Sequence, residues 1–142
     1  MIPTLAGRIQ TRLFLLGTVG LAWTIVVVPF LPKGGVSLGH TYAATILTLF
    51  IVALFGIGWE LLYHLIQQYR WEKDWPVLYA LVEGIPEGIL AFLVVDALIA
   101  LGPSPVTFFC HFVSTWILVW LCAIGPMRMV LLRWRFNGGR IL

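Results

Sequence analysis

Four ionisable side chains in the middle of the chain have types and a spacing that could carry chemistry. Glu60 and His64 are four residues apart, and so are Glu83 and Glu87 within "EGIPEG". Residues four apart lie on one face of a helix. Such a cluster could share protons as a structural element, conduct a proton or a cation, or bind Zn, Mn or Fe. The E-x-x-H spacing of di-iron bundles is absent, so we expect neither a metal nor another cofactor there.

A second polar pair is predicted at Asp96 and His111. Ser104 and Pro105 in "LGPSP" predict the N-cap and the first position of a new helix, so the two flanking helices form a tight antiparallel hairpin. Asp96 and His111 are equally far from the centre of this turn, which puts both about 10 Å from the outer surface. Asp96 points about 180° away from Glu87 around their helix. We therefore expect that helix at the centre of the bundle, with its glutamates toward the preceding helix and Asp96 toward the following one.

The elements that must position these residues are apolar stretches of membrane length. The chain has 142 residues, of which 61% are hydrophobic and 11% charged, whereas a soluble domain carries about 25% charged residues. Crossing about 30 Å of hydrocarbon takes about 20 apolar residues. Four stretches meet this requirement, at about 13–31, 42–66, 77–101 and 106–132. We predict an all-α, polytopic membrane protein whose single domain, 1–142, is a bundle of four transmembrane helices.

Basic residues predict how this bundle is oriented. Eight of the nine flank the stretches on one side, and only Lys33 lies on the other. By the positive-inside rule, both termini face the cytoplasm, in a multi-pass protein of the cytoplasmic (inner) membrane. Arg8 and Arg12 form the basic flank that precedes the first stretch. Because that stretch is longer than a signal-peptide core of about 7–15 residues and lacks a small-x-small site, we expect it to be retained.

Two further groups of residues are predicted to make contacts. Gly84 and Gly88, on the glutamate face, have the G-x-x-x-G spacing that lets another helix approach closely. Aromatic and basic residues near the cytoplasmic ends fit either the lipid headgroup layer or a protein partner, and they are Tyr69, Arg70, Trp71, Trp75, Arg128, Arg133 and Arg135. The last three belong to a basic juxtamembrane segment, 127–142. Apolar residues flank the basic ones, so we expect no nucleic-acid partner.

No sequence pattern of an enzyme accompanies these residues. The sequence lacks a nucleophile–base pairing, a P-loop, a dinucleotide fingerprint and a metalloprotease motif, and its loops are too short for a soluble active site. We therefore expect a non-enzymatic subunit of a larger membrane-embedded assembly, with membrane lipids and other membrane subunits or further copies of itself as partners. The alternative is an oligomeric proton or cation transporter or channel that uses the intramembrane Glu, Asp and His residues.

Overall fold

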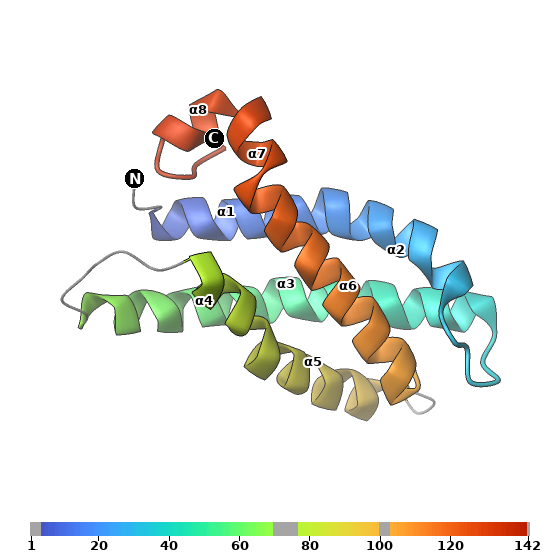
Figure 1. Cartoon of the computed structure of the whole chain (residues 1–142). Helices are drawn as coiled ribbons and strands as arrows, with labels where there is room; N and C mark the ends of the chain where they lie inside the picture. The colour runs from blue at the N-terminus through green and yellow to red at the C-terminus, as the bar shows by residue number, and fades with distance from the viewer. Residues whose placement is uncertain (1–3, 70–76, 100–102, 142) are drawn as a thin grey trace.

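The computed structural model is helical throughout most of the chain that it describes, residues 4–69, 77–99 and 103–141 (Figure 1). The all-helical class predicted from composition is thereby confirmed. The elements follow in chain order as α1 (Leu5–Leu15), the π-helical turn η1 (Leu16–Gly20), α2 (Leu21–Val27), the 3-10 turn η2 (Val28–Phe30), α3 (Leu38–Gln68), α4 (Val77–Val82), α5 (Gly84–Leu98), α6 (Pro105–Ile124), α7 (Pro126–Val130) and α8 (Leu132–Phe136).

Three helical segments are long and apolar enough to cross a membrane, namely Leu5–Phe30, Leu38–Gln68 and Pro105–Val130. They identify a membrane-embedded protein, as composition predicted. The first segment begins at Leu5, ahead of the predicted residue 13, so Arg8 and Arg12 lie within the helix and do not precede it. This corrects their assignment as a basic flank, since both side chains enter the bundle.

The remaining predicted span, 77–101, is divided into two shorter helices. The break falls at Glu83, between α4 and α5. Pro86 has no N–H to donate to the carbonyl four residues earlier, which interrupts the helix at this point. Trp116 on α6 supplies a donor nearby, since its Nε1 lies 3.3 Å from the carbonyl oxygen of Leu81. A fourth crossing by α4 and α5 stays a prediction.

The turn before α6 has the predicted capping. Ser104 Oγ accepts a hydrogen bond from the Thr107 amide at 3.2 Å, and Pro105 occupies the first position of α6. Thr107 Oγ1 also donates to the carbonyl oxygen of Pro32. The turn before α6 and the loop after η2 are therefore joined at the same end of the bundle.

α3 is the central helix, packing against α1, α2, α5 and α6 (Figure 1). α5 lies at the edge, with α3 and α6 as its main neighbours. The predicted central position of the helix at 77–101 is therefore wrong. The physical reason is that α3 has an inward face of small residues, along which neighbouring helices can pack closely. These buried residues are Thr41, Thr45, Thr48 and Gly56.

The C-terminal segment folds back onto the start of α1. The Thr4 amide donates to the carbonyl oxygen of Gly138 at 2.9 Å, and Trp134 Nε1 donates to Thr11 Oγ1 at 2.7 Å. Gly138 and Gly139 turn the chain with φ angles of 64° and 82°, which glycine adopts without strain. Both ends of the described chain therefore lie together at one end of the bundle (Figure 1).

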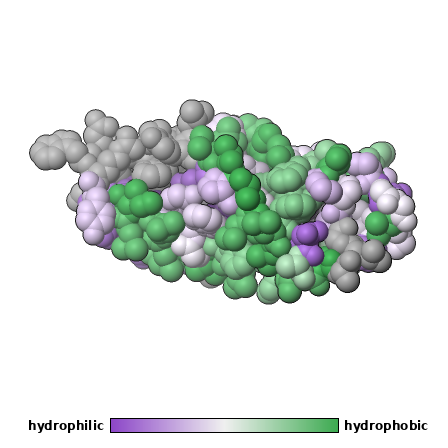
Figure 2. Space-filling view, turned by 90° about the horizontal axis from the view of Figure 1, so that it is seen from below, coloured by the Kyte–Doolittle hydropathy of each residue, from purple (hydrophilic) through white to green (hydrophobic). Residues whose placement is uncertain are grey.

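Apolar side chains cover much of the outside. Large hydrophobic residues such as Phe50 on α3, Leu93 on α5 and Val106 on α6 are exposed, and the face seen in Figure 2 is mostly apolar with polar residues in small groups. In the apolar windows of the three spans, only 28–33% of the residues are buried inside the protein. Most of each span is thus left to contact lipid or other membrane proteins.

Candidate functional site

Arg12 joins two of the carboxylates that the sequence singled out. Its NH1 lies 3.5 Å from Glu60 Oε1 on α3, and its NH2 forms an ion pair with Glu87 Oε2 on α5. The side chains are deeply enclosed, with 9% of Arg12, 11% of Glu60 and 1% of Glu87 exposed. Because Arg12 extends from α1 to both partners, its side chain links three helices.

Arg8, one turn earlier on α1, supplies a second cation. Its Nε lies 3.1 Å from Glu60 Oε2, although not aligned for a hydrogen bond, and its NH1 donates to Gln67 Oε1 at 3.1 Å. We call Arg8, Arg12, Glu60 and Glu87 the ionic cluster. Its two guanidinium groups and two carboxylates balance in charge. This balance matters because removing one partner of a buried ion pair costs about 3–5 kcal/mol.

Gly56 and Trp116 shape the space that Arg12 occupies. A β-carbon on Gly56 would overlap the Arg12 side chain, so only glycine allows the guanidinium to lie along α3 at this point. On α6, the Arg12 Cζ lies 5.1 Å from the centre of the Trp116 ring, within the range of a cation–π interaction. Four helices, α1, α3, α5 and α6, therefore meet at this one side chain.

Some atoms of the ionic cluster have no hydrogen-bond partner among the described residues. They are Glu87 Oε1, Arg8 NH2 and the Nε atoms of both arginines. A buried carboxylate oxygen without a donor is where a water molecule or a proton can bind. Glu87 Oε1 is therefore the chemically open position of the cluster.

The other two members of the predicted cluster are less enclosed. His64 is half-buried on α3, and its described hydrogen bond joins it to Gln68 Nε2 at 3.4 Å. Glu83 is half-buried at the break between α4 and α5. Among the described residues, no three His, Cys, Asp or Glu side chains gather as the ligands of a metal ion would.

The predicted interface residues are described only in part. Tyr69, at the end of α3, is 91% exposed, and Arg128 and Arg133 are exposed on α7 and α8. The others lie outside the described residues, namely Arg70, Trp71, Trp75 and the side chain of Arg135.

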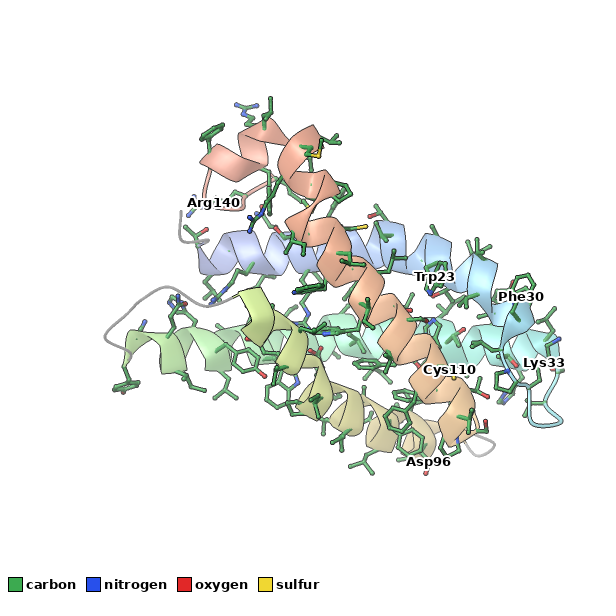
Figure 3. All side chains as sticks on the ribbon, in the orientation of Figure 1. Trp23, Phe30, Lys33, Asp96, Cys110 and Arg140 are labelled. Atoms are coloured by element: carbon green, nitrogen blue, oxygen red, sulfur yellow. The ribbon has the colours of Figure 1, made fainter. Side chains whose placement is uncertain are left out.

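The predicted Asp96–His111 pair is not formed. Asp96 is exposed near the end of α5 and points away from the bundle (Figure 3). His111 is only 1% exposed, and its Nε2 lies 2.8 Å from Thr24 Oγ1 on α2. The expected contact between α5 and α6 at these two residues is therefore replaced by one between α2 and α6.

The register of α5 against α6 explains this difference. Gly88 lies against Phe112, and the rings of Phe92 and Phe108 are 5.1 Å apart. Moving four residues forward on α5, from Gly88 to Phe92, therefore moves the contact four residues back on α6. The next such step brings Asp96 level with the start of α6. The predicted centre of the turn lies too far along the chain, because α5 ends before the predicted residue 101.

The two glycines of α5 leave room for aromatic side chains of α6. A β-carbon on Gly84 would overlap the Trp116 indole, and one on Gly88 would lie 2.6 Å from Phe112 Cε1. The spacing predicted a close neighbour without naming its helix, and at both glycines the neighbouring side chains come from α6. Glu87 is the neighbour of Gly88 and points about 100° away from it, so α5 turns its carboxylate and its glycines in different directions.

Sequence reasoning missed the part played by α1 and the polar interior of α3. Arg8 and Arg12 are four residues apart and so share one face, which was a usable signal of a joint role. On α3, polar residues recur at helical spacing within an apolar stretch, which indicates an inward face. The buried ones are Thr41, Thr45, Thr48, Glu60 and Gln67. We call Thr41, Thr45 and Thr48 the threonine stripe.

No protein-family model, curated protein or solved structure matches this chain. Its function is therefore argued from the geometry of its residues. The ionic cluster, the threonine stripe and the exposed Asp96 are the features that a function has to explain.

Proposed function

We propose that this chain is a non-enzymatic subunit of a larger membrane-embedded assembly, held in the cytoplasmic membrane with both termini on the cytoplasmic side. The ionic cluster supports a structural role for the buried charges. Both carboxylates are engaged by arginine, which keeps its charge at every physiological pH. A neutral cluster that holds α1, α3 and α5 together favours a rigid body whose outer surface does not change shape.

The observation that carries the assembly role is the position of Asp96. The side chain is exposed on α5, between Leu93 and Leu98, which are 60% and 64% exposed. An ionised carboxylate costs about 2.5–3.5 kcal/mol at the centre of a membrane helix, and Asp96, near the end of α5 but between exposed leucines, bears part of this cost. A donor from another subunit would remove that cost, whereas the chain itself offers no described hydrogen bond to this group. We therefore place the contact with a partner subunit on α5.

Replacing Asp96 by leucine tests this placement. If Asp96 meets a partner, Asp96→Leu reduces the amount of complex recovered in mild detergent, while the isolated chain keeps or raises its unfolding temperature because a charge has left an apolar surface. Lys33→Leu is the matched control, since Lys33 is an exposed charge at the same end of the bundle. Native electrophoresis of membranes expressing each variant gives the readout. Full recovery of the complex with Asp96→Leu would contradict the contact.

The juxtaposed ends of the chain support termini on the same side of the membrane, as the proposed orientation requires. Thr4 and Gly138 are hydrogen-bonded, which agrees with an even number of crossings between them. The test starts from a background in which Cys110 and Cys122 are replaced by alanine. Single cysteines at positions 4, 33 and 140 are then labelled in intact cells with a membrane-impermeant maleimide. Labelling at position 33 alone is expected, and labelling at position 4 or 140 would reverse the assignment.

A proton or cation path is the second function that a specific observation favours. Buried polar side chains are also found outside the ionic cluster, where His111 bonds with Thr24 and lines one cavity together with Thr48 and Thr115. Titratable and polar groups buried inside a membrane protein are typical of ion pathways. Reconstituted protein would then conduct protons or cations under an imposed potential, and Glu87→Gln would abolish the flux. Asp96→Asn is the control variant, which should keep the flux. If the unaltered protein shows no flux, the transport function is contradicted and the structural role of the cluster is the one that stands.

A further inference from the structure

A small cavity lies among the first helical segment, α3 and α6, apart from the ionic cluster. The centre of a water-sized molecule can move within about 10 Å³ of this cavity, so the cavity has room for one such molecule. Apolar side chains make up most of its wall, and three polar residues complete it. Those three residues are Thr48, His111 and Thr115.

Two polar atoms at this cavity have no hydrogen-bond partner among the described residues. They are His111 Nδ1 and Thr115 Oγ1. The two side chains are deeply buried, with only 1% and 3% of their surface exposed. Leaving a buried polar atom unpaired costs about 1–3 kcal/mol, so two such atoms beside one cavity indicate a ligand that pairs with both.

The other ring nitrogen of His111 is already engaged. Its Nε2 lies 2.8 Å from Thr24 Oγ1, and that hydroxyl also lies 2.8 Å from the carbonyl oxygen of Gly20. A hydroxyl has one hydrogen to donate. When Thr24 donates to Gly20, His111 donates from Nε2 and its Nδ1 is an acceptor. When Thr24 donates to Nε2 instead, Nδ1 carries the hydrogen and is a donor.

We propose that this cavity binds one water molecule, held by His111 Nδ1 and Thr115 Oγ1. Water suits both tautomers of His111 because it donates and accepts with equal ease. Thr48 Oγ1 donates to the carbonyl oxygen of Ala44 at 2.8 Å and keeps lone pairs for a third contact. Buried waters typically make about three such bonds. A metal ion would fit worse, since the polar wall contains no carboxylate or thiolate.

The water gives α6 a polar connection to α3 in the middle of the bundle, where the remaining wall of the cavity is apolar. His111 and Thr115 are four residues apart on α6 and so share the face that meets Thr48. The proposed site therefore explains why α6 carries two polar residues toward an apolar wall.

Thr115→Val tests the site because valine keeps the shape and removes the hydroxyl. If water is bound, it loses one of its two hydrogen-bond partners in the variant, and the unfolding temperature of the detergent-solubilised protein falls. If the cavity is dry, the same change removes an unpaired hydroxyl, and the unfolding temperature stays or rises. Thr45→Val is the matched control, since the Thr45 hydroxyl is also buried on a helix but bonds to the carbonyl oxygen of Thr41 at 2.9 Å. A midpoint for Thr115→Val that falls below the unaltered protein, as that of Thr45→Val should, supports the water, and one at or above the unaltered protein overturns it.

Nuclear magnetic resonance provides a second readout that needs no change at the site. In a His40→Gln, His64→Gln variant, His111 is the remaining histidine. Magnetisation transfer from water to the His111 ring, measured in bilayers with labelled histidine, is expected at Nδ1. Absence of transfer in a folded sample overturns the proposal.

Discussion

Arg12 of α1 occupies the space beside Gly56 of α3 that the β-carbon of any other residue would fill. Gly56 precedes Glu60 by one helical turn, so the opening and the carboxylate lie on the same face of α3. The guanidinium lies along this face and reaches Glu87 on α5. A glycine in an apolar helix here determines where a charge is placed.

The first prediction concerns this opening. Gly56→Ala displaces the Arg12 side chain and weakens its ion pairs, so we expect the free energy of unfolding to fall by about 1–3 kcal/mol, the usual range for overpacking. Gly58→Ala on the same helix is the control, because no atom lies within 4 Å of the place where a β-carbon on Gly58 would stand. Alanine is the better helix former by about 1 kcal/mol, so the control should hold or gain stability. Denaturant titration in detergent measures the free energy of unfolding of both variants. Equal effects of Gly56→Ala and Gly58→Ala would contradict the proposed role of the space beside Gly56.

The second prediction concerns the charge balance of the ionic cluster. Arg12→Met leaves Glu87 buried without its cation, and we expect a loss of about 3–5 kcal/mol in the free energy of unfolding. Adding Glu87→Gln removes the stranded charge, so the double variant should be more stable than Arg12→Met alone. A double-mutant cycle from denaturant titrations gives the coupling. Additive losses would mean that the two side chains act independently.

The third prediction concerns the contact between α5 and α6. Gly84→Ala pushes the Trp116 indole away and breaks its hydrogen bond to Leu81, so we expect a loss of about 1–3 kcal/mol. In a Trp116→Leu background the collision is relieved, and the cost of Gly84→Ala should shrink. Gly39→Ala is the control, since Gly39 on α3 has open space where a β-carbon would stand. Thermal unfolding of these variants compares the effects, and an undiminished cost in the Trp116→Leu background would refute the collision.

The fourth prediction concerns lipid contact at α7 and α8. Arg128 and Arg133 are exposed there beside Met129 and Val130, which are 79% and 77% exposed. A basic and apolar surface of this kind attracts anionic headgroups, with about 1 kcal/mol for each basic residue. Each change of Arg128 or Arg133 to glutamine should therefore weaken binding of short-chain phosphatidylglycerol about fivefold, with little effect on phosphatidylcholine. Lys33→Gln is the control, and an equal loss with it would point to general charge attraction.

The class of the protein was predictable because composition alone decides it. An apolar chain with few charges needs lipid as its solvent, and every backbone group inside lipid must be paired, which leaves helices. Glu60 and Glu87 were also identifiable, since ionisable residues inside apolar stretches are costly and need a partner. The spacing of Ser104 and Pro105 located the start of α6 correctly.

The partners of these charges were not predictable in the same way. Which cation meets Glu87 depends on how α1 packs, and that packing depends on the space left by Gly56 and the surface offered by Trp116. Local spacing carries no information about such distant neighbours. The error at Asp96 has a different source, because a helix end misplaced by a few residues shifts the whole hairpin and turns a buried side chain outward.

The ion pair between Arg12 and Glu87 joins residues 75 positions apart. A ribosome adds about 5–20 residues per second, so Arg12 waits about 2–10 s for Glu60, 48 positions on, and about 4–15 s for Glu87. Through that interval the insertion machinery, or water at its mouth, has to shelter the guanidinium groups. The first hydrophobic segment to be synthesised is thus among the last to reach its final depth in the bilayer.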